Sequence, residues 1–307
     1  MSTSKAQAVN THYSLLARSD PTPNNTHALK AASSFGYTPE DLAAIPSGAN
    51  LGVSCGNPLA IAGIKPGETI LDLGSGAGFD IFQASLKLGP SGHAIGIDCS
   101  PDMLSLARTN HSKLNPKSNP NPKNIQFILS DISSTLPLDP ETIDCIISNC
   151  VINLLAPPEK KKLCFSECFR VLKRGGRLAV SDILAKRELG EEMRGDLGLF
   201  VGCVGGASLV GEYERWLREV GFEDVLIVDK KSDLNIYKER VPAGEIGTSK
   251  AAESGSSCCA PATSCCGADA NTKNESESAE IRAKRVADID FNEWVSSFSI
   301  YAVKPKK

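Results

Sequence analysis

Residues 70–80 read ILDLGSGAGFD, an apolar run followed by glycines at every second position. Glycine lets a turn bend tightly and lets a ligand lie against main-chain amides at the carboxyl edge of a parallel sheet. A dinucleotide fingerprint would need a glycine in place of Phe79, and no Lys-Ser/Thr pair follows for a nucleoside triphosphate. Both common nucleotide sites are therefore disfavoured. The candidate cofactor-binding residues of this turn are Asp72, Gly74, Gly76 and Gly78.

From about residue 66 onward, short apolar or β-branched runs alternate with segments of helical pattern. The expected strands are TILDLG, HAIGID, IQFIL, TIDCIIS and RLAVSDIL, with DVLIVD and EWVSSFSIYAVK further along. Ser100 caps one helix, and the helix in PPEKKKLCFSECFRVLKRGG is expected to end at Gly175-Gly176. This alternation predicts an α/β fold in which helices cover both faces of a mostly parallel sheet.

The composition divides the chain into five segments. In order, we expect a helical lead-in (1–48), a cofactor-binding domain (49–185), a substrate-binding region (186–245), a flexible Cys-rich segment (246–283) and a closing strand (284–307). The lead-in carries a helix start at Thr38, with Pro39 in the first turn and Asp41 three residues after the cap. The fourth segment has almost no large apolar side chains with which to build a core.

Charge and cysteine content exclude several functional classes. A formal net charge of −3 over 307 residues offers no electrostatic footprint for nucleic acid or an anionic membrane. The sequence shows no signal-peptide pattern and no apolar run of roughly 18 residues that could span a bilayer. We therefore expect a cytoplasmic protein, whose 11 cysteines stay reduced and available for metal, metalloid or redox chemistry.

Two carboxylates follow predicted strands. Asp98 ends the second strand some 20 residues after the glycine turn, where it can accept both hydroxyls of an adenosine ribose. Asp131, followed by Ile132, comes just after the third strand, at the level expected for an adenine amino group. The alternative is that both acids are merely polar strand ends, which loops favour anyway. Three features in register favour the cofactor site.

Together these residues resemble the class I S-adenosylmethionine-dependent methyltransferases over roughly residues 66–185, with the closing strands beyond. The resemblance implies a Rossmann-like, mostly parallel seven-stranded sheet with a smaller C-terminal region, and S-adenosylmethionine as cofactor. In this fold the loop after the fourth strand faces the reactive group of the cofactor.

Three cysteines occupy loop-like settings. Cys150 lies in that loop after the fourth strand, in NCVINL, while Cys55 lies in LGVSCGNP and Cys203 in GCVGGAS. Glycines beside a thiol let the backbone wrap closely around a small ligand, which a bulky organic substrate would not require. The pattern indicates a small, soft target, because soft thiolates prefer soft centres.

The motifs SCGNP, NCVINL and CVGGA, taken with LDLGSGAG, resemble those of the arsenite S-adenosylmethionine methyltransferases. The resemblance implies methyl transfer to thiol-bound trivalent arsenic, as arsenite or methylarsenite, in arsenic detoxification. It also implies that Cys150 and Cys203 hold arsenic, and that Cys55 completes a trigonal site or forms a disulfide during turnover. Thioredoxin or glutathione would then be the reductant, and we expect a monomer.

One feature departs from that family. Many members carry a fourth cysteine in the N-terminal region, and no cysteine precedes Cys55 here. A preference for methylarsenite or a thiol-conjugated substrate over arsenite therefore stays open.

The remaining cysteines have less specific surroundings. Four are expected to be small buried hydrophobes: Cys99, Cys145, Cys164 and Cys168. The pairs 258–259 and 265–266 lack the usual zinc spacing, and either capture of thiophilic species or a dispensable tail fits them. Two other functions remain: a class I methyltransferase acting on another small acceptor (tellurite, selenite or a thiol), and a non-catalytic metalloid-binding protein.

Overall fold

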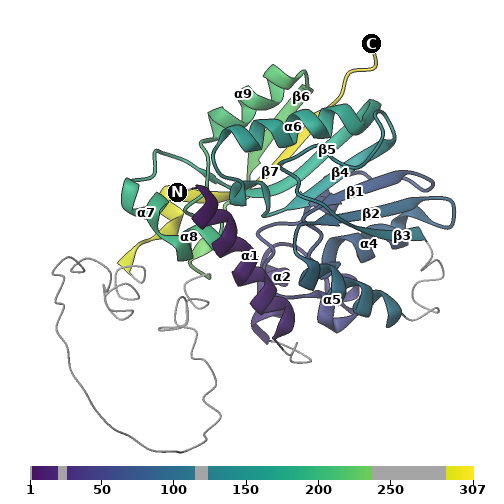
Figure 1. Ribbon diagram of the computed structural model, residues 1–307, viewed down its shortest axis with the longest axis horizontal. Helices are drawn as coiled ribbons and strands as arrows, with labels where there is room; N and C mark the ends of the chain where they lie inside the picture. Colours follow the sequence, from purple (N-terminus) through teal and green to yellow (C-terminus); the bar gives the residue numbers. More distant parts are fainter. Residues whose placement is uncertain (1, 20–25, 115–123, 237–287) are drawn as a thin grey trace, which may run out of the picture. The chain divides into compact units, whose positions relative to one another are not determined.

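Seven strands form one sheet in the order β3-β2-β1-β4-β5-β7-β6 (Figure 1). Strands β1 to β5 pair in parallel, while β7 pairs antiparallel with both β5 and β6. The bounds are Thr69–Leu73 (β1), His93–Asp98 (β2), Ile125–Leu129 (β3), Ile143–Asn149 (β4), Leu172–Ala185 (β5), Glu223–Asp229 (β6) and Val295–Val303 (β7). The predicted mostly parallel seven-stranded sheet is therefore confirmed.

This computed structural model describes residues 2–19, 26–114, 124–236 and 288–307. The chain divides into a unit made of residues 1–234 and 291–307, which contains the sheet, and a unit of residues 235–290. The whole of the predicted Cys-rich segment, with all four of its cysteines, lies outside the described residues.

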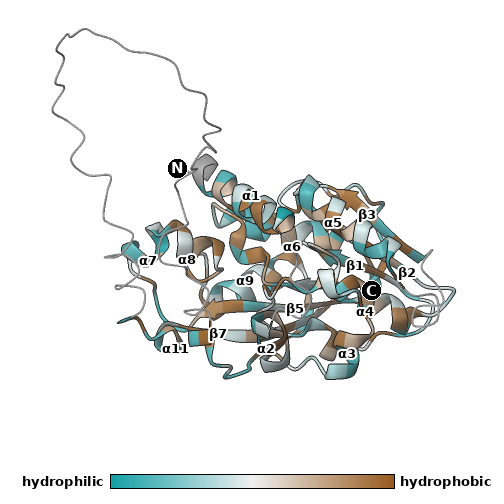
Figure 2. Ribbon diagram, turned by 90° about the horizontal axis from the view of Figure 1, so that it is seen from below, coloured by the Kyte–Doolittle hydropathy of each residue, from teal (hydrophilic) through white to brown (hydrophobic). Residues whose placement is uncertain are grey.

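Helices cover both faces of the sheet, as predicted. On one face, α6 and α9 bury Phe165 and Leu217 in the same apolar core as Leu71 and Leu73 of β1. On the other face, α4 buries Phe82 with Ile70, the residue that alternates with Leu71 along the same strand. In Figure 2 the strands are mainly hydrophobic, whereas the helices carry residues of both kinds. Two apolar cores thus enclose the sheet.

The helices differ widely in length. Their bounds are Ser2–Arg18 (α1), Thr26–Ser34 (α2), Pro39–Ala43 (α3), Phe79–Leu88 (α4), Pro101–Ser112 (α5), Glu159–Val171 (α6), Glu191–Gly195 (α7), Leu197–Val201 (α8), Val210–Val220 (α9) and Phe291–Trp294 (α11). Short 3-10 turns occur at Ser47–Ala49, Pro58–Ala60 and Ile152–Leu154. None of the helices in the described part of the chain is long and apolar enough to cross a membrane.

The helix starts follow the sequence, but one helix end does not. Thr38 and Asp41 form the capping box of α3, and Ser100 Oγ accepts a hydrogen bond from the Met103 amide. The prediction that Gly175-Gly176 ends α6 is wrong. The helix stops at Val171, and the glycines lie inside β5, where the pairing with β4 shifts register and Gly175 has φ +76°. Glycine there permits a bulge rather than a helix end.

The strand order reverses between the neighbouring parallel strands β1 and β4. Chain connections leave these neighbouring strands on opposite sides, because β2 and β3 continue on one side of β1 and β5 continues beyond β4. The loops after the two strands therefore diverge and leave room at their carboxyl ends. Ligands of open α/β sheets bind at such a point, and the glycine turn and Cys150 both follow these strands.

Candidate active site

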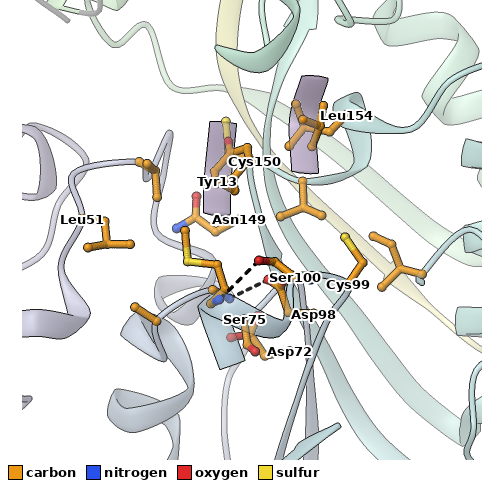
Figure 3. A pocket seen from close by; sticks show the side chains of 18 of the residues that line it. Tyr13, Leu51, Asp72, Ser75, Asp98, Cys99, Ser100, Asn149, Cys150 and Leu154 are labelled. Atoms are coloured by element: carbon orange, nitrogen blue, oxygen red, sulfur yellow. Dashed lines mark hydrogen bonds between the residues drawn. The ribbon is translucent and has the colours of Figure 1, made fainter. Parts of the chain in front are cut away.

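A cavity of about 330 Å³ lies at the carboxyl ends of β1, β2 and β4. Six of the seven predicted cofactor-binding residues line it: Asp72, Gly74, Gly76, Asp98, Asp131 and Ile132. The seventh, Gly78, is not among the lining residues; it precedes α4 with φ +96°, and a Cβ there would lie 2.4 Å from Phe82. Figure 3 shows Asp72, Asp98 and Cys150 around this cavity.

The glycine turn is shaped by close backbone approach. Gly74 has φ +69°, and a Cβ on it would lie 2.4 Å from the side chain of Val151 in the loop after β4. Gly76 has φ +50° with open space where a Cβ would be, and its amide donates to Asp98 Oδ2 at 2.9 Å. Glycine is thus needed at position 74 for packing and backbone conformation, and at position 76 for conformation and access.

Two main-chain amides hold the carboxylate of Asp98 at the end of the cavity next to the glycine turn. Its second oxygen accepts a hydrogen bond from the Ser100 amide at 2.8 Å, and burial raises the pKa of the carboxyl group. The hydroxyl of Ser75 is also buried, and no partner is present for it within the described structure. A polar ligand in the cavity would supply that partner.

The cavity is strongly acidic. Burial, followed by the charges of Asp80 and Asp98, raises the pKa of Asp72 well above its usual value. Burial raises the pKa of Asp80 to about 6, and Asp131 also lines the cavity. A positively charged ligand in the cavity would favour the ionised form of these carboxyl groups.

The three predicted cysteines are neighbours although they lie far apart in the sequence: Cys55 and Cys150 form a candidate ligand group with Asp182, and Cys203 adjoins Cys150 without belonging to that group. One donor atom each from Cys55, Cys150 and Asp182 lies within 4.8 Å of the others, and Cys203 Sγ donates to the Cys150 carbonyl oxygen at 2.9 Å. Cys150 lines the cavity, while all three side chains are at most 6% exposed. The cluster therefore adjoins the cavity and excludes water.

The backbone is strained at two of these cysteines. Cys150 has φ +60° and Cys203 has φ +66°, a left-handed conformation that costs a non-glycine residue of order 1–3 kcal/mol. Such conformations persist only where surrounding contacts enforce them, and they concentrate at functional sites. In this conformation the Cys203 thiol reaches the main-chain carbonyl oxygen of Cys150.

Burial makes all three thiols weak acids. It raises the pKa of Cys55 to about 12 and that of Cys150 well above its usual value. A hydrogen bond with Cys150, followed by burial, does the same to Cys203. The carboxylate of Asp182 adds to the increase at each. The thiols are thus protonated at neutral pH, and they become thiolates only when a soft ion replaces the protons.

Asn149 holds Cys55 in place. Its Oδ1 accepts from the Cys55 amide at 3.2 Å, and its Nδ2 donates to Asp80 Oδ2 at 2.9 Å and to the Tyr37 hydroxyl at 3.0 Å. The Tyr37 hydroxyl donates in turn to Asp80 Oδ1. One asparagine at the end of β4 thereby links a thiol to a cavity carboxylate.

Asn153, three residues after Cys150, forms a second hydrogen-bond network. Its Nδ2 donates to Asp182 Oδ1 at 3.0 Å, and its Oδ1 accepts from the buried ammonium of Lys161. Lys161 also donates to the Gly206 carbonyl and to Ser208 Oγ. This network ties the loop that carries Cys203 to the loop that carries Cys150.

The glycines near Cys203 have a packing role within the protein. A Cβ on Gly206 would lie 2.1 Å from the Asn153 carbonyl oxygen, and one on Gly205 would lie 2.7 Å from the Met193 carbonyl oxygen. These glycines bring protein loops close together beside the thiol. The close approach still sets where the thiol lies.

Three of the four remaining described cysteines are buried, as predicted: Cys145, Cys164 and Cys168. The prediction is wrong for Cys99. Its side chain is exposed and lines the cavity, because it directly follows Asp98 at the end of β2.

Helix α1 supplies a wall that the sequence did not reveal. Tyr13 lines the cavity, Arg18 forms an ion pair with Asp102 of α5 at 3.0 Å, and Lys5 donates to the Arg194 carbonyl at the end of α7. The helix therefore bridges the cofactor side and the segment that precedes Cys203. Its sequence is only weakly patterned, so this role follows from tertiary contacts alone.

Comparison with known proteins identifies the scaffold. Residues 64–221 match the family described as "Methyltransferase domain". The arsenite methyltransferase of Halobacterium salinarum is 45% identical over 196 residues, which make up 64% of this chain and 48% of that protein. The human arsenite methyltransferase is 36% identical over 155 residues, or 50% of this chain and 40% of the other. The chain thus spans about half the length of the curated relatives it matches or less.

Solved structures agree on the fold. An arsenic(III) S-adenosylmethionine methyltransferase from Chlamydomonas reinhardtii has a TM-score of 0.53 at 24% identity, covering 91% of this chain and 73% of that one. A phosphoethanolamine N-methyltransferase 2 from Haemonchus contortus has a TM-score of 0.56 at 17% identity, with 91% and 57% covered. Since the family match extends over more than half of its length, the chain belongs to the methyltransferase-domain family.

Proposed function

We propose that this protein transfers a methyl group from S-adenosylmethionine to trivalent arsenic held by Cys55, Cys150 and Cys203. The observation that carries the proposal is the thiol cluster beside the acidic cavity, with Cys150 belonging to both. The arsenite methyltransferases of Halobacterium salinarum and human, which this chain resembles over half or more of its length, support the same reaction.

The cavity fits the cofactor. S-adenosylmethionine carries a net positive charge, which the four acidic residues favour. Asp98 would hold the ribose hydroxyls, Asp131 and Ile132 would lie at the adenine, and the free hydroxyl of Ser75 offers a further polar contact. When bound, S-adenosylmethionine supplies a methyl group on a positively charged sulfur, and the arsenic lone pair can attack the carbon of that methyl group.

The thiols hold the substrate. Arsenous acid can exchange its three hydroxyl groups for three thiolates, and each thiol proton leaves in a water molecule. Because neutral thiols and neutral arsenous acid give a neutral complex, the high thiol pKa values do not oppose binding in the dry site. No general base is needed, since the attacking lone pair carries no proton.

Cys150 connects the arsenic-binding thiols with the cavity from which the methyl group is transferred. It is the one cluster thiol among the residues lining the cavity, so it places arsenic at the cavity wall. A well-oriented pair of reactants gains several kcal/mol over free encounter. The methylated arsenic is pentavalent and cationic, with three thiolates bound. Two of these thiolates would leave as a disulfide and return two electrons to arsenic, and water would add a hydroxyl group to the trivalent product while one proton leaves. Thioredoxin or glutathione would then reduce that disulfide.

The test uses the whole chain with S-adenosylmethionine, arsenite and a thiol reductant, and follows arsenic species and S-adenosylhomocysteine together. The proposal predicts one S-adenosylhomocysteine for each methyl group that appears on arsenic. Methylarsenite offered as substrate shows which species is preferred. Turnover with tellurite, selenite or an organic thiol, but with neither arsenic species, would overturn the proposed acceptor, and metalloid binding without product would indicate a non-catalytic protein.

A further inference from the structure

One carboxylate lies among the thiols. Asp182 of β5 is completely buried, and one of its oxygens lies within 4.8 Å of Cys55 Sγ and Cys150 Sγ. It is absent from the cavity lining, whereas Cys150 is part of it. Asp182 therefore faces the cluster from the protein interior and not from the cavity.

The hydrogen bonds of Asp182 indicate that it is not a ligand. Oδ1 accepts from Asn153 Nδ2 at 3.0 Å and from the Ile183 amide at 2.9 Å. Oδ2 accepts from the Tyr213 hydroxyl at 2.9 Å and from the Asn153 amide at 3.3 Å. A carboxylate has about four lone-pair sites, so these donors occupy its capacity and fix its orientation. The group is held as an oriented charge.

We propose that Asp182 is a fixed negative charge that stabilises the positive charge developing on arsenic during methyl transfer. The inference rests on the proposed function. As the lone pair becomes the arsenic–carbon bond, arsenic is oxidised and becomes cationic. The electron pair of the broken sulfur–carbon bond stays on the departing sulfur, which becomes neutral, and no proton moves.

The arrangement favours the transition state over the bound substrates. Positive charge begins on the cavity side and ends among the thiols, which is the side that Asp182 faces. An interaction that strengthens along this path lowers the barrier, and a low-dielectric site enlarges it. The buried cation Lys161 donates its hydrogen bonds to Asn153, Gly206 and Ser208, all neutral groups. It offsets part of the carboxylate charge without binding it.

The primary test compares the wild-type chain with Asp182→Asn in three measurements. Equilibrium dialysis gives arsenite bound per protein, calorimetry gives S-adenosylhomocysteine affinity, and single-turnover experiments give the rate of arsenic methylation. We expect binding of both ligands to change little, while the single-turnover rate falls about 100-fold, as for loss of one preorganised electrostatic group. An unchanged rate, or a rate loss matched by lost arsenite binding, would overturn the inference.

A second pair of variants keeps the test decisive if the asparagine cannot accept the four donors and the protein misfolds. Asp182→Glu and Asp182→Gln extend the side chain equally and differ in charge. The inference predicts that the glutamate variant methylates arsenic at least about 10-fold faster than the glutamine variant. Equal rates would contradict it. Failure of the proposed function is distinguishable, because the wild-type chain itself would then produce no methylated arsenic.

Discussion

The cofactor cavity and the thiol cluster are built in opposite ways. The cavity is formed mainly by chain segments that directly follow β1, β2 and β4, and main-chain amides such as that of Gly76 shape it. The cluster brings together Cys55, Cys150 and Cys203 from three distant loops and is almost closed to solvent.

The two regions differ in the contacts that hold their functional residues in place. Asp98 is fixed by amides within two residues of itself and by the neighbouring glycine turn. The thiols instead depend on side chains behind them, since Asn149 holds Cys55, and Asn153 and Lys161 connect the loops of Cys150 and Cys203. Changes in the cavity should therefore weaken one ligand, whereas changes in the cluster should stop the reaction.

The largest effect is expected for Cys150→Ser. Removing an outer partner of a metal ligand already costs about 10–100-fold in affinity or activity, so loss of a thiol ligand should reduce arsenic methylation by at least about 100-fold. Affinity for S-adenosylhomocysteine, measured by calorimetry, should change little. Cys145→Ser is the matched control, because Cys145 lies inside β4, the strand that Cys150 directly follows, and does not belong to the cluster. Equal losses in both variants would show that β4 packing, not ligation, is affected.

A smaller and more selective effect is expected for Asp98→Asn. The variant weakens charge-assisted hydrogen bonds from two amides and the proposed ribose contact, each worth about 1.5–3 kcal/mol. S-adenosylhomocysteine affinity should fall roughly 10–100-fold in calorimetry, while arsenite binding in dialysis stays the same. Loss of arsenite binding as well would erase the distinction between the two regions.

The stability cost of replacing Gly74 or Gly76 by alanine tests how tightly the cavity packs against the loop of Cys150. Gly76→Ala meets no neighbouring atom and should cost about 1–2 kcal/mol from its left-handed backbone alone. Gly74→Ala carries the same strain and also overlaps Val151, which adds about 1–3 kcal/mol. Urea unfolding of the two variants measures the difference. Equal losses would mean that the Val151 loop moves freely, contrary to a tightly fixed Cys150.

The smallest effect concerns pH. Burial raises the pKa of Asp182 to about 6, above its unfolded value near 3.8. A carboxyl group with a raised folded pKa stabilises the fold below pH 4, and this contribution is lost as pH rises through about 6. Removing the group in Asp182→Asn should flatten the decline of unfolding free energy between pH 4 and 7 by roughly 1–3 kcal/mol. If the unfolding free energy, measured with urea, declined equally with pH in the two proteins, the pKa of Asp182 would not be raised.

Local patterns predicted most of the sheet. Strands such as Thr69–Leu73 are short apolar runs with clear ends, and the Thr38 and Ser100 caps lie next to the helices they start. The failure at Gly175-Gly176 has a physical reason. Glycine ends helices and also permits bulges, and only pairing with β4 decides between them.

The site could be predicted only in part. Cys55, Cys150 and Cys203 each stand in a recognisable motif, so their convergence was expected. Their supports were not, because an aspartate inside a predicted strand and a lysine inside a predicted helix carry no sign that both face the cluster. The one local signal is the motif NCVIN, in which Asn149 and Asn153 flank the central thiol and organise its two sides.

X-ray absorption at the arsenic edge tests the central claim most directly, because it reports the atoms bonded to arsenic in the loaded protein. The account predicts three sulfur neighbours and no oxygen neighbour in the wild-type chain, and two sulfur neighbours in Cys150→Ser. The matched control Cys145→Ser should give the wild-type spectrum. Arsenic that keeps its oxygen neighbours, or a spectrum that Cys150→Ser leaves unchanged, would contradict the account.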